Sequence, residues 1–238
     1  MSIQFLEKHY SWQDITLWDF IEEGNSPKSW LQFFIDNQDI LYSVSKKLQE
    51  EGGDCIYPSI NHVFRAFIPL DKIRVVILGQ DPYHNGSAVG YCFSVLPGNS
   101  INPSLKNIYK ELKSEGYDVK EDGILTHWAD QGCFMLNTAL TVQKGCPDSH
   151  TSIWYDFTEK AIKYVADNCK NIIWLLMGSK AHSFKCFVPK EHLTICTSHP
   201  SPFSAHRHSN DIPAFLSSGA FMKINIHLKK CGYKQINW

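Results

Sequence analysis

Apolar residues form four short continuous runs in the part of the chain that follows residue 70. These runs occupy residues 73–78, 133–136, 172–177 and 193–197. Such runs are typical of strands that are buried on both faces of a sheet. Segments with helical patterns lie between them, at residues 103–115, at 150–168 and, more briefly, after Gly178. Strands that alternate with helices predict an α/β fold with a central, four-stranded, mainly parallel twisted sheet and helices on both faces.

Both ends of the chain have helical patterns as well. Apolar residues within 30–34 and 40–48 follow helical spacing, and the second group ends at Gly52-Gly53. Residues 215–230 have the pattern of a terminal helix, which Gly232 follows. No repeat, low-complexity tract or flexible linker interrupts the sequence. We therefore expect a single domain over residues 1–238, in which a mainly helical part, residues 1–70, packs on the α/β core.

Composition narrows the class of protein. Of the 238 residues, 43% are hydrophobic and 20% are charged, as in ordinary globular proteins. No apolar run is long enough to span a bilayer, and the first twenty residues lack the pattern of a secretion signal. Eight cysteines without a C-x-x-C pair favour reduced thiols and argue against a metal or iron–sulfur site. We expect an intracellular protein, in the cytoplasm or the nucleus, whose gene is cellular or viral. The net charge of −1 argues mildly against a general nucleic-acid binder, but it leaves room for a local basic face.

A polar cluster follows each of the four apolar runs. The carboxyl ends of parallel strands meet at one edge of a sheet, where open α/β sheets bind their ligands, so we expect the clusters to converge. Taken singly, each has a simpler interpretation: Asp81 could be the N-cap of a helix that begins at Pro82, and His199 an ordinary loop histidine. Gly79, which ends the first run, permits an unusual backbone angle. The clusters are Gln80-Asp81-Pro82-Tyr83-His84, Asn137-Thr138, Gly178-Ser179-Lys180 and Ser198-His199-Pro200-Ser201-Pro202.

Together the clusters supply a carboxylate, an imidazole and an amide, and Phe93 adds an aromatic plane. Amides and aromatic rings in combination suit the recognition of a flat heterocycle with donors and acceptors on its rim. A generic nucleotide-binding protein would instead carry a glycine-rich phosphate loop after its first strand. The chain has no G-x-G-x-x-G or G-K-[ST] loop, so this class is disfavoured.

Residues 69–84 resemble the water-activating loop of the family 1 uracil-DNA glycosylases. Five further motifs resemble those of the same family, in the same order. They lie at residues 92–95, 103–109, 136–142, 178–179 and 199–202. The resemblance covers roughly residues 30 to 238.

This resemblance implies a monofunctional uracil-DNA glycosylase of base-excision repair. Such an enzyme flips uracil out of DNA and hydrolyses the N-glycosidic bond, which releases uracil and leaves an abasic site. Phe93 would stack on the flipped base, and Asn137 would pair with its N3–H and O4. Tyr83 would exclude the methyl group of thymine by its bulk, and Gln80 would add a polar contact to the base.

The resemblance also implies three catalytic residues. Ionised Asp81 would stabilise the oxocarbenium-like sugar and position the attacking water, and neutral His199 would donate to uracil O2. His84 would help to hold the water and the Asp81 loop. None of these three catalytic residues is a lysine, so Schiff-base lyase activity is not implied, and no metal or other cofactor is needed.

The implied DNA contacts come from hydroxyl and backbone N–H groups in rigid loops, with one charged residue and one apolar wedge. These DNA-binding residues are Ser104, Ser179, Ser201, Phe203, Ser204 and Arg207. The sequence departs from the family pattern in three places. Phe203 stands where the family usually has leucine, the loop after His84 is one residue shorter, and residues 208–214 add about six residues beside the DNA-facing segment.

Uracil-containing single- or double-stranded DNA is the implied partner of a monomeric protein. A proteinaceous inhibitor that mimics DNA is a second partner that the resemblance suggests. The alternative is a non-catalytic DNA-binding or polymerase-accessory protein on the same fold. The presence of Asp81, His199 and Asn137 favours the enzyme.

Overall fold

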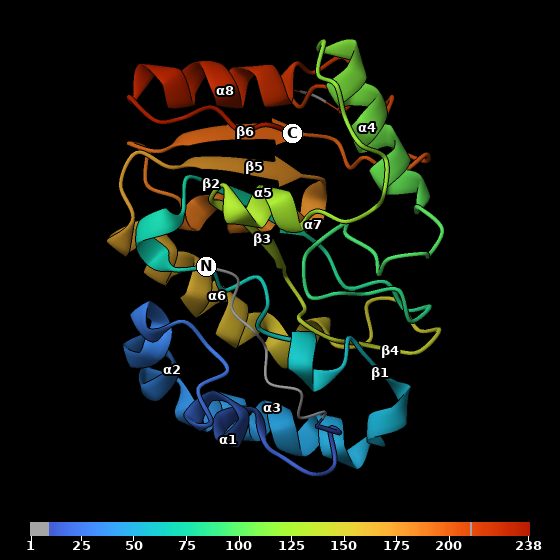
Figure 1. Ribbon diagram of the computed structural model, residues 1–238, viewed down its shortest axis with the longest axis vertical. Helices are drawn as coiled ribbons and strands as arrows, with labels where there is room; N and C mark the ends of the chain where they lie inside the picture. The colour runs from blue at the N-terminus through green and yellow to red at the C-terminus, as the bar shows by residue number, and fades with distance from the viewer. Residues whose placement is uncertain (1–9, 210) are drawn as a thin grey trace.

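The computed structural model describes residues 10–209 and 211–238. Its central sheet contains β2 (Val75–Gly79), β3 (Cys133–Asn137), β5 (Ile173–Met177) and β6 (Leu193–Thr197). The strand order is β3-β2-β5-β6, and each neighbouring pair is parallel (Figure 1). The α/β prediction is confirmed. Because Gly79 pairs with Asn137 and Met177 with Thr197, all four strands end at the same edge.

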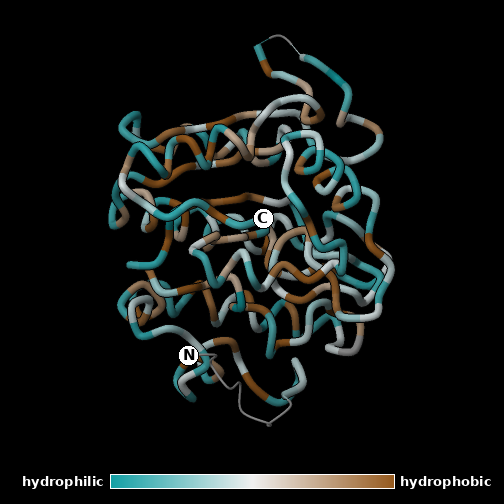
Figure 2. Tube along the Cα trace, turned by 45° about the horizontal axis from the view of Figure 1, so that its top comes forward, coloured by the Kyte–Doolittle hydropathy of each residue, from teal (hydrophilic) through white to brown (hydrophobic). Residues whose placement is uncertain are grey.

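Helices cover both sides of this sheet. In Figure 1, α4 (Pro103–Ser114) and α8 (Ala220–Lys230) lie above it, and α6 (Thr151–Asn168) lies below. Two short helices flank the strands, α5 (Thr126–Asp130) before β3 and α7 (Ser179–His182) after β5. Figure 2 shows hydrophobic stretches running through the middle of the molecule and hydrophilic ones through many of the outer turns. Hydrophobic residues in the interior are what the continuous apolar sequences of the buried strands require.

The segment before β2 packs against this core. It contains α1 (Leu17–Glu22), α2 (Leu31–Asp36) and α3 (Gln38–Glu50), and the 3-10 turns Lys28–Trp30, Gly53–Cys55, Ile60–His62 and Leu70–Lys72. The buried Trp30 ring stacks on Phe134 of β3, with ring centroids 5.6 Å apart. Residues 1–9 of the expected helical part lie outside the described residues.

A second, two-stranded sheet was not predicted. In it β1 (Ile56–Tyr57) pairs antiparallel with β4 (Val142–Gln143). Strands of two residues are too short to show an alternating pattern, so only the tertiary structure reveals them. Their pairing ties the N-terminal segment to the chain that follows β3.

The terminal helix begins at Ala220, and the prediction that it starts at residue 215 is wrong. Two residues ahead of it, Ser217 and Gly219, have left-handed φ angles of 67° and 66°, which a helix does not contain. The buried Glu111 carboxylate of α4 accepts hydrogen bonds from the N–H groups of both residues. Glu115 accepts from the N–H groups of Phe221 and Met222, in the first turn of α8. Glu111 of α4 and Glu115, the residue after its C-terminal end, thus fix where α8 starts.

None of the helices in the described ranges combines the length and the apolar character that crossing a bilayer requires. All eight cysteines are free thiols, and Cys92 and Cys133 are fully buried beside the sheet.

Candidate active site

The loop after β2 carries Asp81 in a half-buried position, and no helix starts there. The N-cap interpretation is therefore wrong. The Asp81 Oδ2 atom instead accepts a hydrogen bond of 2.7 Å from the backbone N–H of Asp148, in the loop between β4 and α6. Burial raises the pKa of the Asp81 carboxyl above its ordinary value, the Asp148 N–H opposes this shift, and the Asp148 charge adds to it. The exposed His84 lowers the pKa of Asp81 through its charge.

Gly79 and Gln80 join the ends of β2 and β3. Gly79 has no positive φ angle, so the unusual backbone that its identity suggested is not present. The Gln80 carbonyl oxygen accepts from the Thr138 hydroxyl at 2.8 Å and from the Ala139 N–H at 3.0 Å. These bonds hold the Asp81 loop at a fixed distance from the end of β3.

Asn137, the last residue of β3, is only 6% exposed. No hydrogen bond joins its side-chain amide to another described residue, and the amide is not among the polar atoms that are fully enclosed without a partner, so solvent reaches it. A Cβ atom on Gly79 would lie 2.4 Å from Asn137 Oδ1, so glycine is required at position 79 for lack of space. An amide that no neighbouring residue engages is suited to an incoming polar ligand.

Tyr83 and Phe93 meet at this edge. The Tyr83 hydroxyl donates to the Phe93 carbonyl oxygen at 3.1 Å, and burial raises the pKa of the phenol, which keeps it protonated. Phe93 adopts a left-handed φ of 65°, a strained conformation for an aromatic residue that surrounding contacts must hold. Strain of this kind is concentrated at functional sites.

His199 follows β6 and lies near the Phe93 ring, with ring centroids 6.0 Å apart. Its Nδ1 atom accepts a hydrogen bond of 3.0 Å from the Ser201 N–H. A nitrogen that accepts carries no proton, so the neutral ring has its proton on Nε2. Burial lowers the pKa of His199 below the ordinary value, which favours this neutral form.

The loop after β6 is held by its own serines. Ser201 and Ser204 share a hydrogen bond of 2.8 Å between their hydroxyl groups, and Ser204 Oγ donates to the His199 carbonyl oxygen. Asn107 of α4 donates to the Pro200 carbonyl oxygen at 2.8 Å. Phe203 is 82% exposed, an unusual position for a large apolar ring. The loop is therefore fixed in shape while its apolar tip projects into solvent.

The remaining residues with predicted DNA contacts lie at or near the surface. Ser179 and Arg207 are exposed, and Ser104 is half-buried at the second position of α4. Near these residues, Ser209 and Ile212 form an isolated antiparallel bridge.

Asp148 is the residue that reasoning from the sequence missed. Its place in the short polar turn Pro147-Asp148-Ser149 was the one available signal, and such turns are common. In the described part of the chain, no three histidine, cysteine or acidic side chains gather as metal ligands would.

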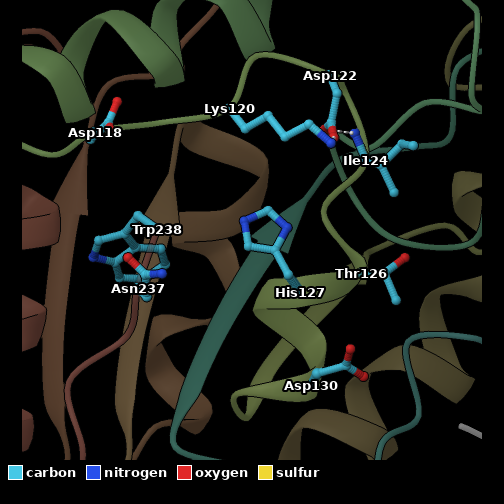
Figure 3. Close-up of a pocket in the computed structure, with 9 residues that line it drawn as sticks. All are labelled: Asp118, Lys120, Asp122, Ile124, Thr126, His127, Asp130, Asn237 and Trp238. Carbon is cyan, nitrogen blue, oxygen red and sulfur yellow. Dashed lines mark hydrogen bonds and ion pairs between the residues drawn. The ribbon is translucent and has the colours of Figure 1, made fainter.

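A separate cavity of about 490 Å³ lies between the α4–α5 connection, α5 and the C-terminal residues. Figure 3 shows His127 and the pair Lys120 and Asp122 among its lining residues. None of the predicted site residues lines this cavity, so it is distinct from the edge formed by the strand ends.

Comparison with known proteins gives a consistent result. The family model described as Uracil DNA glycosylase superfamily matches residues 66–228. A uracil-DNA glycosylase of Azotobacter vinelandii is 41% identical over 80% of this chain and 82% of its own length. One of Buchnera aphidicola subsp. Cinara cedri is 40% identical over 88% and 94%, respectively. The crystal structure of mimivirus uracil-DNA glycosylase has a TM-score of 0.88 at 30% identity, over 99% of this chain and 95% of that one.

The fold and the site define an α/β protein that collects an acid, an imidazole, a buried amide and an aromatic ring at the carboxyl edge of a parallel sheet. Within this class, the chain belongs to the uracil DNA glycosylase superfamily, because that family model matches more than half of it.

Proposed function

We propose that the chain is a monofunctional uracil-DNA glycosylase that releases uracil from DNA by hydrolysis and leaves an abasic site. Family membership and relatives of this activity at about 40% identity support the proposal. The same comparisons disfavour the alternative of a non-catalytic DNA-binding or polymerase-accessory protein.

The hydrogen bond from the Ser201 N–H to His199 Nδ1 is the observation that most directly supports an enzymatic function. When the bond between C1′ and N1 breaks, negative charge develops on the uracil, and O2 needs a donor that is already aimed at it. A neutral imidazole with its proton on Nε2 is such a donor, and its protonation state is set before substrate binds. Preorganised donors of this kind are typically worth about 3–4 kcal/mol of transition-state stabilisation.

Asp81 complements His199 on the sugar side. Its ionised carboxylate would stabilise the positive charge that develops on the sugar and orient the attacking water, with His84 beside it. Asp81 has one oxygen bound by the Asp148 N–H, which leaves the other available.

The base pocket would be formed by four residues. Phe93 would stack on the flipped base, and the unbound Asn137 amide would pair with uracil N3–H and O4, where cytosine presents the reverse pattern. Tyr83 would fill the space beside C5, and Gln80 would contact the base rim.

DNA would be gripped by the serine loops around this pocket. Ser104, Ser179, Ser201 and Ser204 would bind phosphates, and Arg207 would add charge. Phe203 would enter the space that the flipped base leaves. Its exposure supports this role, because a buried ring could not insert.

The test uses a uracil-containing oligonucleotide, followed by alkaline cleavage of abasic sites. Wild type should produce the cleaved strand, and Asp81→Asn should lose almost all of this activity. Asp71→Asn, which removes an exposed acid outside the site, is the control and should match wild type. A wild-type protein that binds the oligonucleotide and leaves it intact would instead be a non-catalytic DNA-binding or polymerase-accessory protein. Borohydride should trap no covalent complex, since no lysine takes part.

We also propose a protein partner. A mimivirus UNG variant was crystallised in complex with UGI, and it has a TM-score of 0.85 and 32% identity over 91% of this chain and 90% of that one. We infer that a protein inhibitor of that kind competes with DNA for the same edge of the sheet. We also infer a monomer within the cytoplasm or the nucleus. A DNA substrate and eight free thiols fit that location.

A further inference from the structure

Asp148 occupies an uncommon backbone conformation beside the site. Its φ angle is 67°, in the left-handed region where aspartate and asparagine are the best tolerated residues after glycine. The residue is exposed and lies in the turn that leads from β4 into α6. In this conformation its backbone N–H and its side chain both form hydrogen bonds.

The left-handed backbone aims the Asp148 N–H at Asp81. The bond to Asp81 Oδ2 is 2.7 Å long, which is typical of a donor bound to an ionised acceptor. It crosses 67 residues of sequence, so the strand-end loop and the α6 turn are joined directly at the carboxylate.

The Asp148 side chain interacts with three further residues near the site. Its Oδ1 accepts from the Thr151 hydroxyl at 2.7 Å, and its Oδ2 lies 3.1 Å from Lys180 Nζ. The Gln80 side chain also lowers the pKa of the Asp148 carboxyl. One carboxylate thus connects α6, α7 and the loop that carries Asp81.

We propose that Asp148 is a positioning residue for Asp81, an inference that rests on the proposed function. Its backbone N–H fixes the orientation of the Asp81 carboxylate, and its side-chain charge sets the electrostatic environment in which Asp81 ionises.

Because charged groups surround Asp81, the role of Asp148 can be measured through the pKa of Asp81. Asp148 acts on it from the turn before α6 and His84 from its own loop, while Lys180 of α7 pairs with Asp148. The negative charge of Asp148 raises the pKa of Asp81. Removal of that charge therefore lowers the pKa of Asp81, and the acid limb of the kcat–pH profile moves to lower pH.

Two substitutions separate the backbone from the charge. Asp148→Asn removes the charge but keeps the N–H donor and a residue type that tolerates the left-handed angle. The acid limb should therefore shift. The fall in kcat should be smaller than in a variant that moves the backbone. Asp148→Val is β-branched and opposes the left-handed angle, so the N–H should leave Asp81. The loss of a hydrogen bond to a charged group predicts a fall in kcat of roughly tenfold to a hundredfold, with KM for DNA unchanged. Asp167→Asn, an exposed acid near the far end of α6, is the control for net charge and should match wild type.

A second readout is independent of activity. The carbon-13 shift of the Asp81 carboxyl, assigned by its absence in Asp81→Asn, reports the pKa of that group directly. It should titrate at lower pH in Asp148→Asn than in wild type and Asp167→Asn.

The outcomes separate the two proposals. An inactive wild type would overturn the proposed function, whereas the Asp81 titration would still test its link to Asp148. An active wild type whose acid limb and Asp81 titration are unchanged in Asp148→Asn would overturn the positioning role. So would an Asp148→Val variant with wild-type kcat.

Discussion

Asn137 Oδ1 lies so close to Gly79 that a Cβ atom on the glycine would be 2.4 Å from it and 2.6 Å from Cys92 Cβ. Backbone pairing between the ends of β2 and β3 sets this approach. The glycine therefore makes room for a side chain on the neighbouring strand.

Gly79→Ala should displace the Asn137 amide. We expect kcat/KM on uracil-containing DNA to fall at least about tenfold, and the free energy of unfolding to fall by about 1–3 kcal/mol from overpacking. Gly24→Ala is a useful control, because its positive φ strains the variant while nothing lies within 4 Å. It should lose stability and keep kcat/KM. Equal losses of activity in both variants would show that Gly79 matters only for stability.

His199 should be neutral throughout the working pH range. Burial lowers its pKa, so the neutral form prevails above a midpoint lower than that of an exposed histidine. Nitrogen-15 spectra at neutral pH should show the proton on Nε2 and none on Nδ1. His199→Ala should reduce kcat about 100- to 1,000-fold, the usual cost of one preorganised donor. A protonated Nδ1 at neutral pH would contradict the assignment.

Tyr83→Ala should admit thymine. The half-buried phenol is held by the Phe93 carbonyl, so the wild-type side chain does not move aside. The variant should release thymine from an oligonucleotide on which wild type has no activity. Tyr42→Ala changes an exposed tyrosine of α3, outside the site, and should keep wild-type selectivity. Strict uracil selectivity in Tyr83→Ala would remove this residue from the pocket.

Phe203→Ala should impair duplex substrates more than single strands. A wedge is needed where the base leaves a stacked helix, and unstacking costs a few kcal/mol per step. We expect kcat/KM on duplex DNA to fall roughly tenfold, with a smaller loss on single strands. Phe203→Leu should retain most of the duplex activity. Equal effects on both substrates would argue for a general contact rather than a wedge.

Glu115 should make stability depend on pH. Burial raises its pKa to about 7, and the neighbouring Glu111 adds to the shift. A raised pKa means that the protonated form stabilises the fold, and this contribution is lost as pH rises from about 4.5 through about 7. The melting temperature of wild type should therefore fall relative to Glu115→Gln between pH 5 and pH 8. Glu50→Gln, at an exposed position of α3, should follow wild type. Parallel curves for wild type and Glu115→Gln would refute the prediction.

The apolar runs were sufficient to predict the strands of the central sheet, since buried parallel strands need continuous apolar sequence. The same pattern placed residues 80–84, 137–138, 178–180 and 198–202 at one edge. It failed for the start of α8 and for the β1–β4 pair. These features depend on Glu111 and on partners far along the chain, which no local pattern contains.

The sequence by itself therefore determined the fold class, the edge that carries the site and the residue types available for chemistry. The tertiary structure decided how those residues are held: Asp81 by the Asp148 N–H, His199 in one protonation state by Ser201, and Asn137 by its close approach to Gly79. Periodicity encodes burial, which is a local property of the chain. Hydrogen bonds between loops 67 residues apart arise only when the whole sheet has formed.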